Sequence, residues 1–140
     1  MADKGYEFFE HTADVGVRIF GATLNELFVH ASQGLKELLV EDSPIAASER
    51  RAMNLNAGAV ETLLQTWLKE LLFWFATDRF LPAQYRLDIV EATRLQGEVV
   101  GERFNPSRHA QGTEVKGVTY HQLQVKQTDQ GWEAQVIFDV

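Results

Sequence analysis

Three oxygen donors near the two ends of this sequence could together hold a divalent cation. Asp14 comes near the beginning, whereas Asp139 and the α-carboxylate of Val140 stand side by side at the end. If the last strand of the fold runs beside Asp14, these hard oxygen ligands suit Ca²⁺, Mg²⁺ or Mn²⁺ better than a soft metal. Taken alone, each feature has an ordinary explanation, because a single Asp is common in turns and most chain ends are frayed.

A second polar cluster, GTEVKGVTYH, covers residues 112–121 and contains Lys116 and His121. These two residues are an odd number of positions apart. On an unbroken strand they would face opposite sides, so they could not form an acid–base pair without a bulge or an end effect. Periodicity alone therefore favours a solvated lysine and an ordinary structural histidine.

The composition excludes several classes of site and partner. No cysteine is present, which rules out disulfide scaffolds, thiolate zinc sites and cysteine nucleophiles. The 140 residues hold 13 Lys and Arg against 20 Asp and Glu, and the formal net charge of −7 disfavours direct binding to nucleic acid. Phosphate-loop, dinucleotide-binding, Gly-x-Ser-x-Gly and His-Glu-x-x-His motifs are absent. Without a signal-peptide pattern or a bilayer-long apolar run, we expect a cytoplasmic protein with no membrane contact.

Two helices are expected to position these residues. Thr23 and Glu26 have the spacing of a capping box, and the apolar stripe after them predicts a helix over about 24–39. A broad apolar face between Gly58 and Asp78 predicts the main buried helix. Its aromatic side chains have helical spacing, which favours core packing over base stacking; they are Trp67, Phe73, Trp74 and Phe75.

Strands are predicted around residues 15–20, 53–55, 87–90, 95–100, 115–126 and 132–140, from alternating or continuous apolar residues. The turn at 129–131 joins the last two of these strands as a hairpin. In the last strand, Asp139 falls on the face opposite Phe138. This order of elements predicts a single α+β domain over residues 1–140, with two helices covering one face of a largely antiparallel sheet.

Four segments resemble the archease family in their order and spacing: FEHTADVG at 9–16, WLKELLF at 67–73, GTEVKGVTYH at 112–121 and VIFDV at 136–140. The resemblance covers nearly the whole chain. It implies a small protein that activates RtcB-type RNA ligases, the GTP-dependent enzymes that join 2′,3′-cyclic phosphate or 3′-phosphate ends to 5′-hydroxyl ends in tRNA splicing and RNA repair. It also implies no catalytic activity of its own, since the family promotes guanylylation of the ligase and multiple turnover.

The same resemblance assigns roles to individual residues. Asp14, Asp139 and Val140 correspond to the family's ligands for a divalent cation, expected here to be Ca²⁺ or Mn²⁺, with Mg²⁺ also admissible. Lys116, His121 and His11 are expected to contact the ligase or to tune the site. The sequence departs from the family at three positions: Glu10 stands where Asp is usual, Asn105 where Asp is common in the Phe-x-Pro loop, and Gly117 where Ala is common.

Two other functions stay open at this point. A general chaperone or interaction module would fit the small acidic domain and its aromatic-rich helix. A metal-dependent hydrolase would need a general base beside an open coordination position, and the sequence places neither His11 nor His121 there. We rank the hydrolase last.

Overall fold

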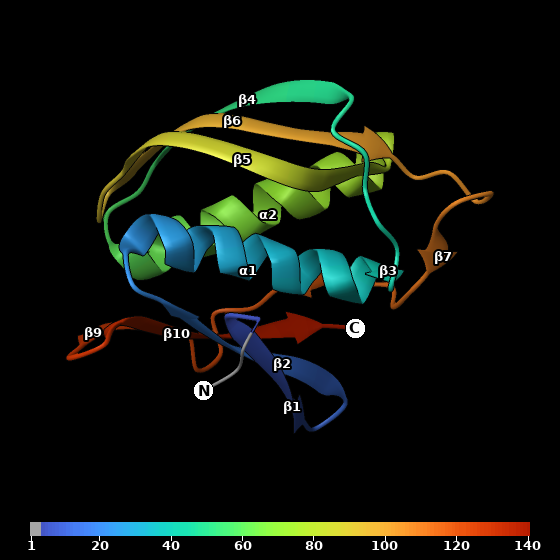
Figure 1. Cartoon of the computed structure of the whole chain (residues 1–140). Coiled ribbons are helices and arrows are strands. Elements are labelled where there is room, and N and C mark those ends of the chain that lie inside the picture. Colours follow the sequence, from blue (N-terminus) through green and yellow to red (C-terminus); the bar gives the residue numbers. More distant parts are fainter. Residues whose placement is uncertain (1–3) are drawn as a thin grey trace.

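The computed structural model describes residues 4–140, which form three layers (Figure 1). Helix α1 (Leu24–Leu39) and helix α2 (Val60–Asp78) make the middle layer, with an antiparallel sheet on either side. The predicted α+β class, two helices and antiparallel pairing are confirmed. The expectation that both helices cover one face of a single sheet is wrong, because both helices pack against strands of the two flanking sheets.

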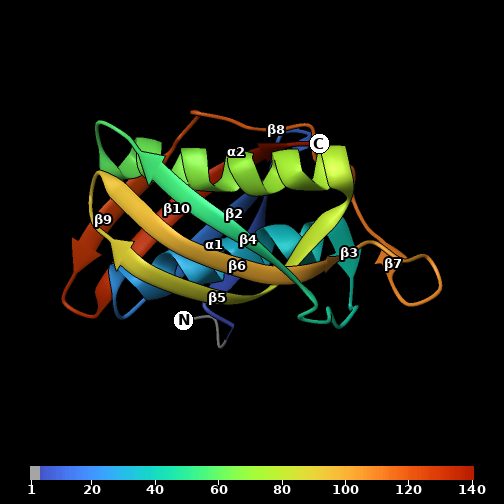
Figure 2. The same cartoon turned by 90° about the horizontal axis from the view of Figure 1, so that it is seen from above.

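The first sheet contains the strands that carry the predicted site. Its order is β1 (Tyr6–His11), β2 (Asp14–Gly21), β10 (Gly131–Asp139) and β8 (Gly117–Val118), and β9 (Gln124–Thr128) also pairs with β10. Figure 2 shows β8 beside the C-terminal end of β10. The predicted hairpin of the last two strands is confirmed as β9 and β10.

The second sheet has the order β4 (Glu49–Asn56), β6 (Arg94–Arg103) and β5 (Phe80–Val90). A separate two-stranded pair is formed by β3 (Val40–Glu41) and β7 (Ala110–Gln111) at one end of the molecule (Figure 2). The β4–β6–β5 sheet covers the helices on the side opposite the first sheet (Figure 1).

Helix α1 has the bounds that its capping box predicts. The Thr23 hydroxyl accepts a hydrogen bond from the Glu26 amide at 3.1 Å, and a Glu26 carboxylate oxygen accepts one from the Ala22 amide at 3.4 Å. This reciprocal pair satisfies two amide groups that the helix itself leaves unpaired. Helix α2 ends where Arg79 adopts the left-handed conformation, with a φ of 59°.

The aromatic residues of α2 have different environments. Trp67 is fully buried, and its indole Nε1 donates to the carbonyl oxygen of Phe28 at 2.9 Å. Trp74 is half-buried and meets Phe80 edge-on, with ring centroids 5.6 Å apart. Core packing is therefore confirmed for these two and for Phe75, which is buried, but Phe73 points outward with 58% of its surface exposed.

The predicted strand over 115–126 is wrong in its continuity. The chain pairs with β10 at β8, leaves the sheet over residues 119–123, and returns as β9. Gln122 takes a φ of 53°, and the Leu123 amide donates to the Tyr120 carbonyl at 3.2 Å, which closes a turn between the two strands. This turn changes where the side chains of Tyr120 and His121 lie.

Candidate metal centre

The site is built on a hairpin that the sequence did not predict. Strand β1 pairs with β2 from Tyr6 opposite Ile19 to His11 opposite Asp14, so that only Thr12 and Ala13 form the turn. Both turn residues have positive φ, 29° and 68°. Two-residue hairpin turns of this kind favour Asn-Gly, because other residues pay a steric cost there of roughly 1–3 kcal/mol each. The turn is therefore strained, and it holds His11 and Asp14 directly opposite each other.

Three strands bring His11, Asp14 and Asp139 into one row, which we call the outer row. The pair of Val15 and Phe138 is the last that β2 and β10 form, and Asp14 and Asp139 lie one position beyond it on the two strands. Phe138 and Val17 are buried in the core, and successive side chains along a strand point to opposite faces. Asp14 and Asp139 therefore both fall on the face that points away from the helices. His11 and Asp14 are directly opposite each other, and Cβ atoms of such pairs lie about 5 Å apart. The strand ends that carry Asp14 and Asp139 are neighbours in the same sheet.

The outer face beside this row is packed rather than bare. The Phe9 ring lies over Gly16, where a Cβ atom would collide with it, and Gly16 pairs with Ile137. Ile137 is fully buried although it lies on the outer face. An apolar floor therefore adjoins the carboxylates, which lowers the local dielectric constant and strengthens any interaction with a cation.

The second predicted cluster also reaches the outer row. The Lys116 amide donates to the Asp139 carbonyl at 2.7 Å, which places Lys116 beside the end of β10, with its side chain exposed. Beyond β8, the turn at 119–123 brings the His121 ring to 5.0 Å from the His11 ring, centroid to centroid. The odd spacing of Lys116 and His121 does not place them on opposite faces of one strand, because the strand is broken between them.

The outer row carries donor groups of the kind that divalent cations bind, but its side chains do not form a complete ligand set as they stand in residues 4–140. Neither Asp14 nor Asp139 forms an ion pair with another residue in the described range 4–140. Nδ1 of His11 is buried and has no hydrogen-bond partner among these residues. In the same range, no three His, Asp or Glu side chains already converge at ligand distance. Completion of the site requires the α-carboxylate of Val140 or rotation of exposed side chains such as Asp139 and His121.

Two of the three departures from the family pattern leave the outer row unchanged. Glu10 pairs with Val15, so its side chain lies on the opposite face of the hairpin from His11 and Asp14. Gly117 pairs with Asp139, and a Cβ atom there would meet nothing within 4 Å. An alanine at position 117 would therefore fit without displacing the row.

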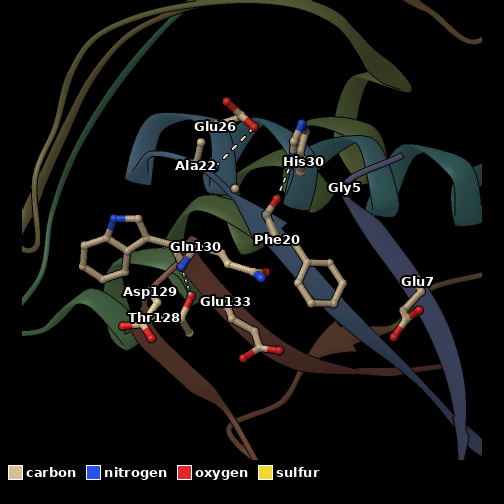
Figure 3. Close-up of a pocket in the computed structure, with 12 residues that line it drawn as sticks. Gly5, Glu7, Phe20, Ala22, Glu26, His30, Thr128, Asp129, Gln130 and Glu133 are labelled. Carbon is tan, nitrogen blue, oxygen red and sulfur yellow. Dashed lines mark hydrogen bonds between the residues drawn. The ribbon is translucent and has the colours of Figure 1, made fainter. Parts of the chain in front are cut away.

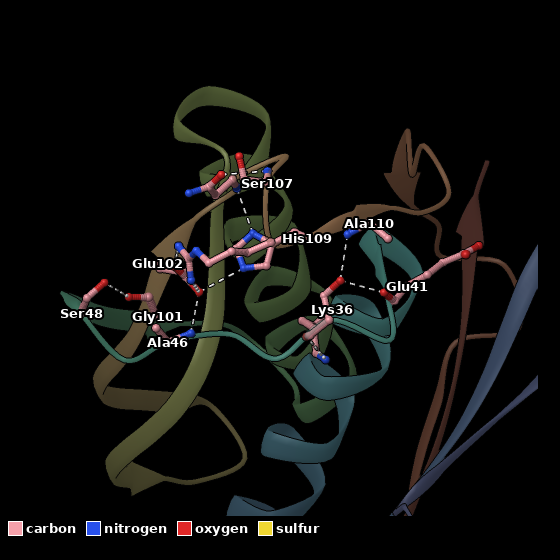
Figure 4. A network of polar contacts seen from close by, with 12 residues as sticks. Lys36, Glu41, Ala46, Ser48, Gly101, Glu102, Ser107, His109 and Ala110 are labelled. Atoms are coloured by element: carbon pink, nitrogen blue, oxygen red, sulfur yellow. Dashed lines mark hydrogen bonds and ion pairs between the residues drawn. The ribbon is translucent and has the colours of Figure 1, made fainter.

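The third departure, Asn105, is bonded to His109 and so belongs to a polar network separate from the outer row. Figure 4 shows Glu102, Ser107 and His109 of this network. The side-chain oxygen of Asn105 accepts from the Ser107 amide at 2.9 Å, and its own amide donates to Nδ1 of His109 at 2.8 Å. Nε2 of His109 then donates to Glu102 at 3.0 Å. Asn105 thus orders its own loop, and it holds no ligand position in the outer row.

Glu102 is the acceptor at the centre of this network, although it is almost completely buried. Besides His109, Arg108 and the Ala46 amide donate to its carboxylate. Hydrogen bonding from Arg108 is the main cause that lowers the pKa of Glu102 to about 2, although burial opposes it. The sequence analysis did not identify this network, and its residues lack any motif spacing that would have revealed it. Its role is to join two loops.

A cavity of about 690 Å³ lies away from the outer row. It is at the other end of β2, beside Gly21 and the β9–β10 turn (Figure 3). Four carboxylates line it, from Glu7, Glu26, Asp129 and Glu133. Two of them are already paired, Glu7 with Arg18 at 3.8 Å and Glu133 with Lys126 at 3.5 Å. The candidate metal centre therefore has to be judged on its row of ligands and not on cavity size.

The sequence matches the Archease protein family (MTH1598/TM1083) over residues 6–140. The chain belongs to the archease family. Protein archease of Methanosarcina acetivorans is 33% identical to it over 141 residues, covering 98% of this chain and 97% of the relative. Protein archease of Saccharolobus solfataricus is 37% identical over 138 residues, covering 98% and 99%. The predicted family is confirmed.

Solved structures support the archease fold. The solution structure of protein 1598 of Methanobacterium thermoautotrophicum matches with a TM-score of 0.81 at 32% identity, covering 98% of this chain and 99% of that one. A Thermotoga maritima crystal structure, described as an archease and possible chaperone, matches with a TM-score of 0.65 at 22% identity, covering 94% of each chain, and it supports the fold alone. In residues 4–140, neither helix is long and apolar enough to cross a membrane.

Proposed function

We propose that this protein is a metal-binding activator of an RtcB-type, GTP-dependent RNA ligase, and that it has no catalytic activity of its own. The outer row is the observation that supports the proposal, because Asp14 and Asp139 lie at adjoining ends of β2 and β10 in a chain of the archease family. Asp14, Asp139 and the α-carboxylate of Val140 hold a divalent cation, Ca²⁺ or Mn²⁺. When bound, this ion supplies positive charge that offsets the repulsion of the carboxylates and can polarise an oxygen of the partner.

The protein's own residues orient the site toward the ligase. The strained turn fixes Asp14 against His11, and the Lys116 amide holds the end of β10 through the Asp139 carbonyl. Lys116, His121 and Tyr120, which is 66% exposed, surround the row and form the surface that contacts the ligase. This contact favours the ligase conformation in which its active-site histidine accepts GMP.

The charge of the protein fits this partner better than it fits RNA. A protein of net charge −7 is repelled by RNA phosphates and attracted to the basic cleft in which a ligase binds RNA. We therefore assign no direct nucleic-acid contact to this chain. Its role in tRNA splicing or RNA repair in the cytoplasm is exerted through the ligase.

The test is a time course of GMP attachment to the purified ligase with radiolabelled GTP. The wild-type protein is expected to accelerate guanylylation, and Asp14→Ala or Asp139→Ala to remove the acceleration while the protein stays folded. Gly117→Ala is the matched control, because it changes the residue opposite Asp139 without filling occupied space. Full stimulation by both aspartate variants would refute the metal-dependent function.

A general chaperone is the competing function, and exposed aromatic residues are what it would use. Phe8, Phe73 and Tyr120 are 40%, 58% and 66% exposed. They belong to β1, α2 and the turn after β8, and single exposed apolar residues are common on protein surfaces. Suppression of aggregation of unrelated proteins in EDTA, with no effect on the ligase, would favour the chaperone over the activator.

A further inference from the structure

We infer that Nδ1 of His11 is a nitrogen ligand of the cation site, and that this ligand gives the site a preference for a transition-metal ion such as Mn²⁺ over Ca²⁺. The inference rests on the proposed metal-binding function, and it adds a ligand to the three oxygen donors assigned there. It concerns which ion the site selects.

The register of the β1–β2 hairpin places His11 directly opposite Asp14, and both residues fall on the outer face. Cβ atoms of opposite residues in such a sheet are about 5 Å apart. Metal–oxygen and metal–nitrogen bonds are about 2.0–2.6 Å long, so an ion bound by Asp14 lies within reach of His11. On the other side of β2, Asp139 lies one position beyond the last pair of β2 and β10.

The unpaired nitrogen of His11 is an observation independent of the acidic residues. Nδ1 is buried, and the residues of the described chain offer it no hydrogen-bond partner. A buried polar atom without a protein partner costs free energy, so such an atom is normally satisfied by a water molecule, an ion or another ligand. A metal ion satisfies an imidazole nitrogen directly, since neutral imidazole is the commonest metal-binding side chain.

Two further features hold the His11 ring in place. The His121 ring lies 5.0 Å from it at an interplanar angle of 59°, so that it packs against one side. The turn at Thr12 and Ala13, with both φ angles positive, fixes the backbone of His11 against Asp14. His121 is exposed and acts here as a positioning residue, whereas His11 is the ligand.

A nitrogen donor changes which ion is favoured. Ca²⁺ binds oxygen ligands almost exclusively, whereas first-row transition metals accept imidazole together with carboxylates. The three oxygen donors alone would leave Ca²⁺ and Mn²⁺ close in affinity. With His11 added, Mn²⁺ gains a bond that Ca²⁺ does not.

The experiment measures metal affinity and metal–nitrogen contact in the full chain. Titration calorimetry with Mn²⁺ and with Ca²⁺ is carried out on the wild type, His11→Ala, His11→Gln and His121→Ala, with folding verified by circular dichroism. His11→Ala and His11→Gln are expected to weaken Mn²⁺ binding by about tenfold or more, and Ca²⁺ binding by less than about twofold. His121→Ala is expected to weaken Mn²⁺ binding less than either.

Pulsed electron paramagnetic resonance of Mn²⁺ gives the direct readout. We expect ¹⁴N modulation from a bound imidazole in the wild type and its loss in the His11 variants. Absence of ¹⁴N modulation in the wild type, its persistence without His11, or its loss only in His121→Ala would overturn the inference. Failure of the proposed function is distinguishable, because it would show as unchanged ligase guanylylation in the aspartate variants.

Discussion

Addition of metal should reverse the order of stability of the wild-type protein and the Asp139→Asn variant. Without metal, Asp139→Asn is expected to be more stable than the wild type, because it removes the repulsion between two carboxylates that folding brings together. With metal, the wild type is expected to be more stable, because only its intact site gains binding free energy. A residue that served packing alone would not produce this reversal.

The size of the repulsion is worked for Asp14 and Asp139 at the spacing of opposite residues, since they lie one position beyond the last pair of β2 and β10. Two unit charges about 5 Å apart repel by about 1 kcal/mol in a water-like dielectric and by about 3 kcal/mol at an effective constant of 20. Asp139 is exposed, so the lower figure applies. For a chain of 140 residues, this corresponds to a rise of about 3 °C in the Tm of the metal-free variant.

The metal contributes in the opposite direction. At a free concentration of 100 times Kd, an ion that binds only the folded state stabilises it by about 2.7 kcal/mol. The wild-type Tm should therefore rise by about 9 °C with saturating Mn²⁺. The Tm of Asp139→Asn should rise much less, so that the order of the two proteins is reversed.

Thermal unfolding followed by circular dichroism, in EDTA and then in Mn²⁺, measures both effects. Asp129→Asn is the control, because it removes one exposed carboxylate in the β9–β10 turn, away from the outer row. It should keep the full metal-induced rise. Equal rises in the wild type and in Asp139→Asn, or a less stable metal-free variant, would refute the argument.

Three further results are expected. Ala13 has a φ of 68°, which is strained for alanine but not for glycine. Ala13→Gly should therefore raise the free energy of unfolding, measured in urea, by about 1 kcal/mol. No gain would mean that the turn is not strained. Glu102 has a pKa of about 2 in the folded protein, below its ordinary 4.5, so its contribution to stability is complete above pH 4.5 and is lost as the pH falls toward 2. Urea unfolding over that pH range should therefore show that Glu102→Gln loses less free energy of unfolding on acidification than the wild type does. A short polar extension after Val140 should weaken Mn²⁺ binding in calorimetry without lowering the Tm in EDTA, and undiminished affinity would exclude the α-carboxylate as a ligand.

Local signals predicted the elements whose ends and faces are set by neighbouring residues. Helix α1 begins and ends as expected, because the Thr23 and Glu26 capping pair acts within one turn and the apolar stripe defines the buried face. The β9–β10 hairpin was predicted for a similar reason, since Gly131 readily adopts its positive φ of 126°.

Long-range packing decided the features that were mispredicted. An apolar stripe shows that a helix face is buried but not what covers it, so the two flanking sheets could not be inferred from α1 or α2. The β1–β2 turn carries Thr12 and Ala13, neither of which favours a positive φ, and it therefore had no turn signature. The interruption between β8 and β9 likewise depends on Gln122, which adopts a positive φ of 53° that is uncommon for residues other than glycine.

The sequence alone determined which donor types are available to the proposed site: hard oxygens at Asp14 and Asp139, no thiolate, and a chain of net charge −7. Their motifs also indicated the family, which the comparisons confirmed. The tertiary structure decided which donors are neighbours. Pairing of β2 with β1 places His11 opposite Asp14, and pairing of β2 with β10 brings the end of β10, with Asp139, beside the start of β2. Strands distant in sequence become neighbours only when the sheet forms.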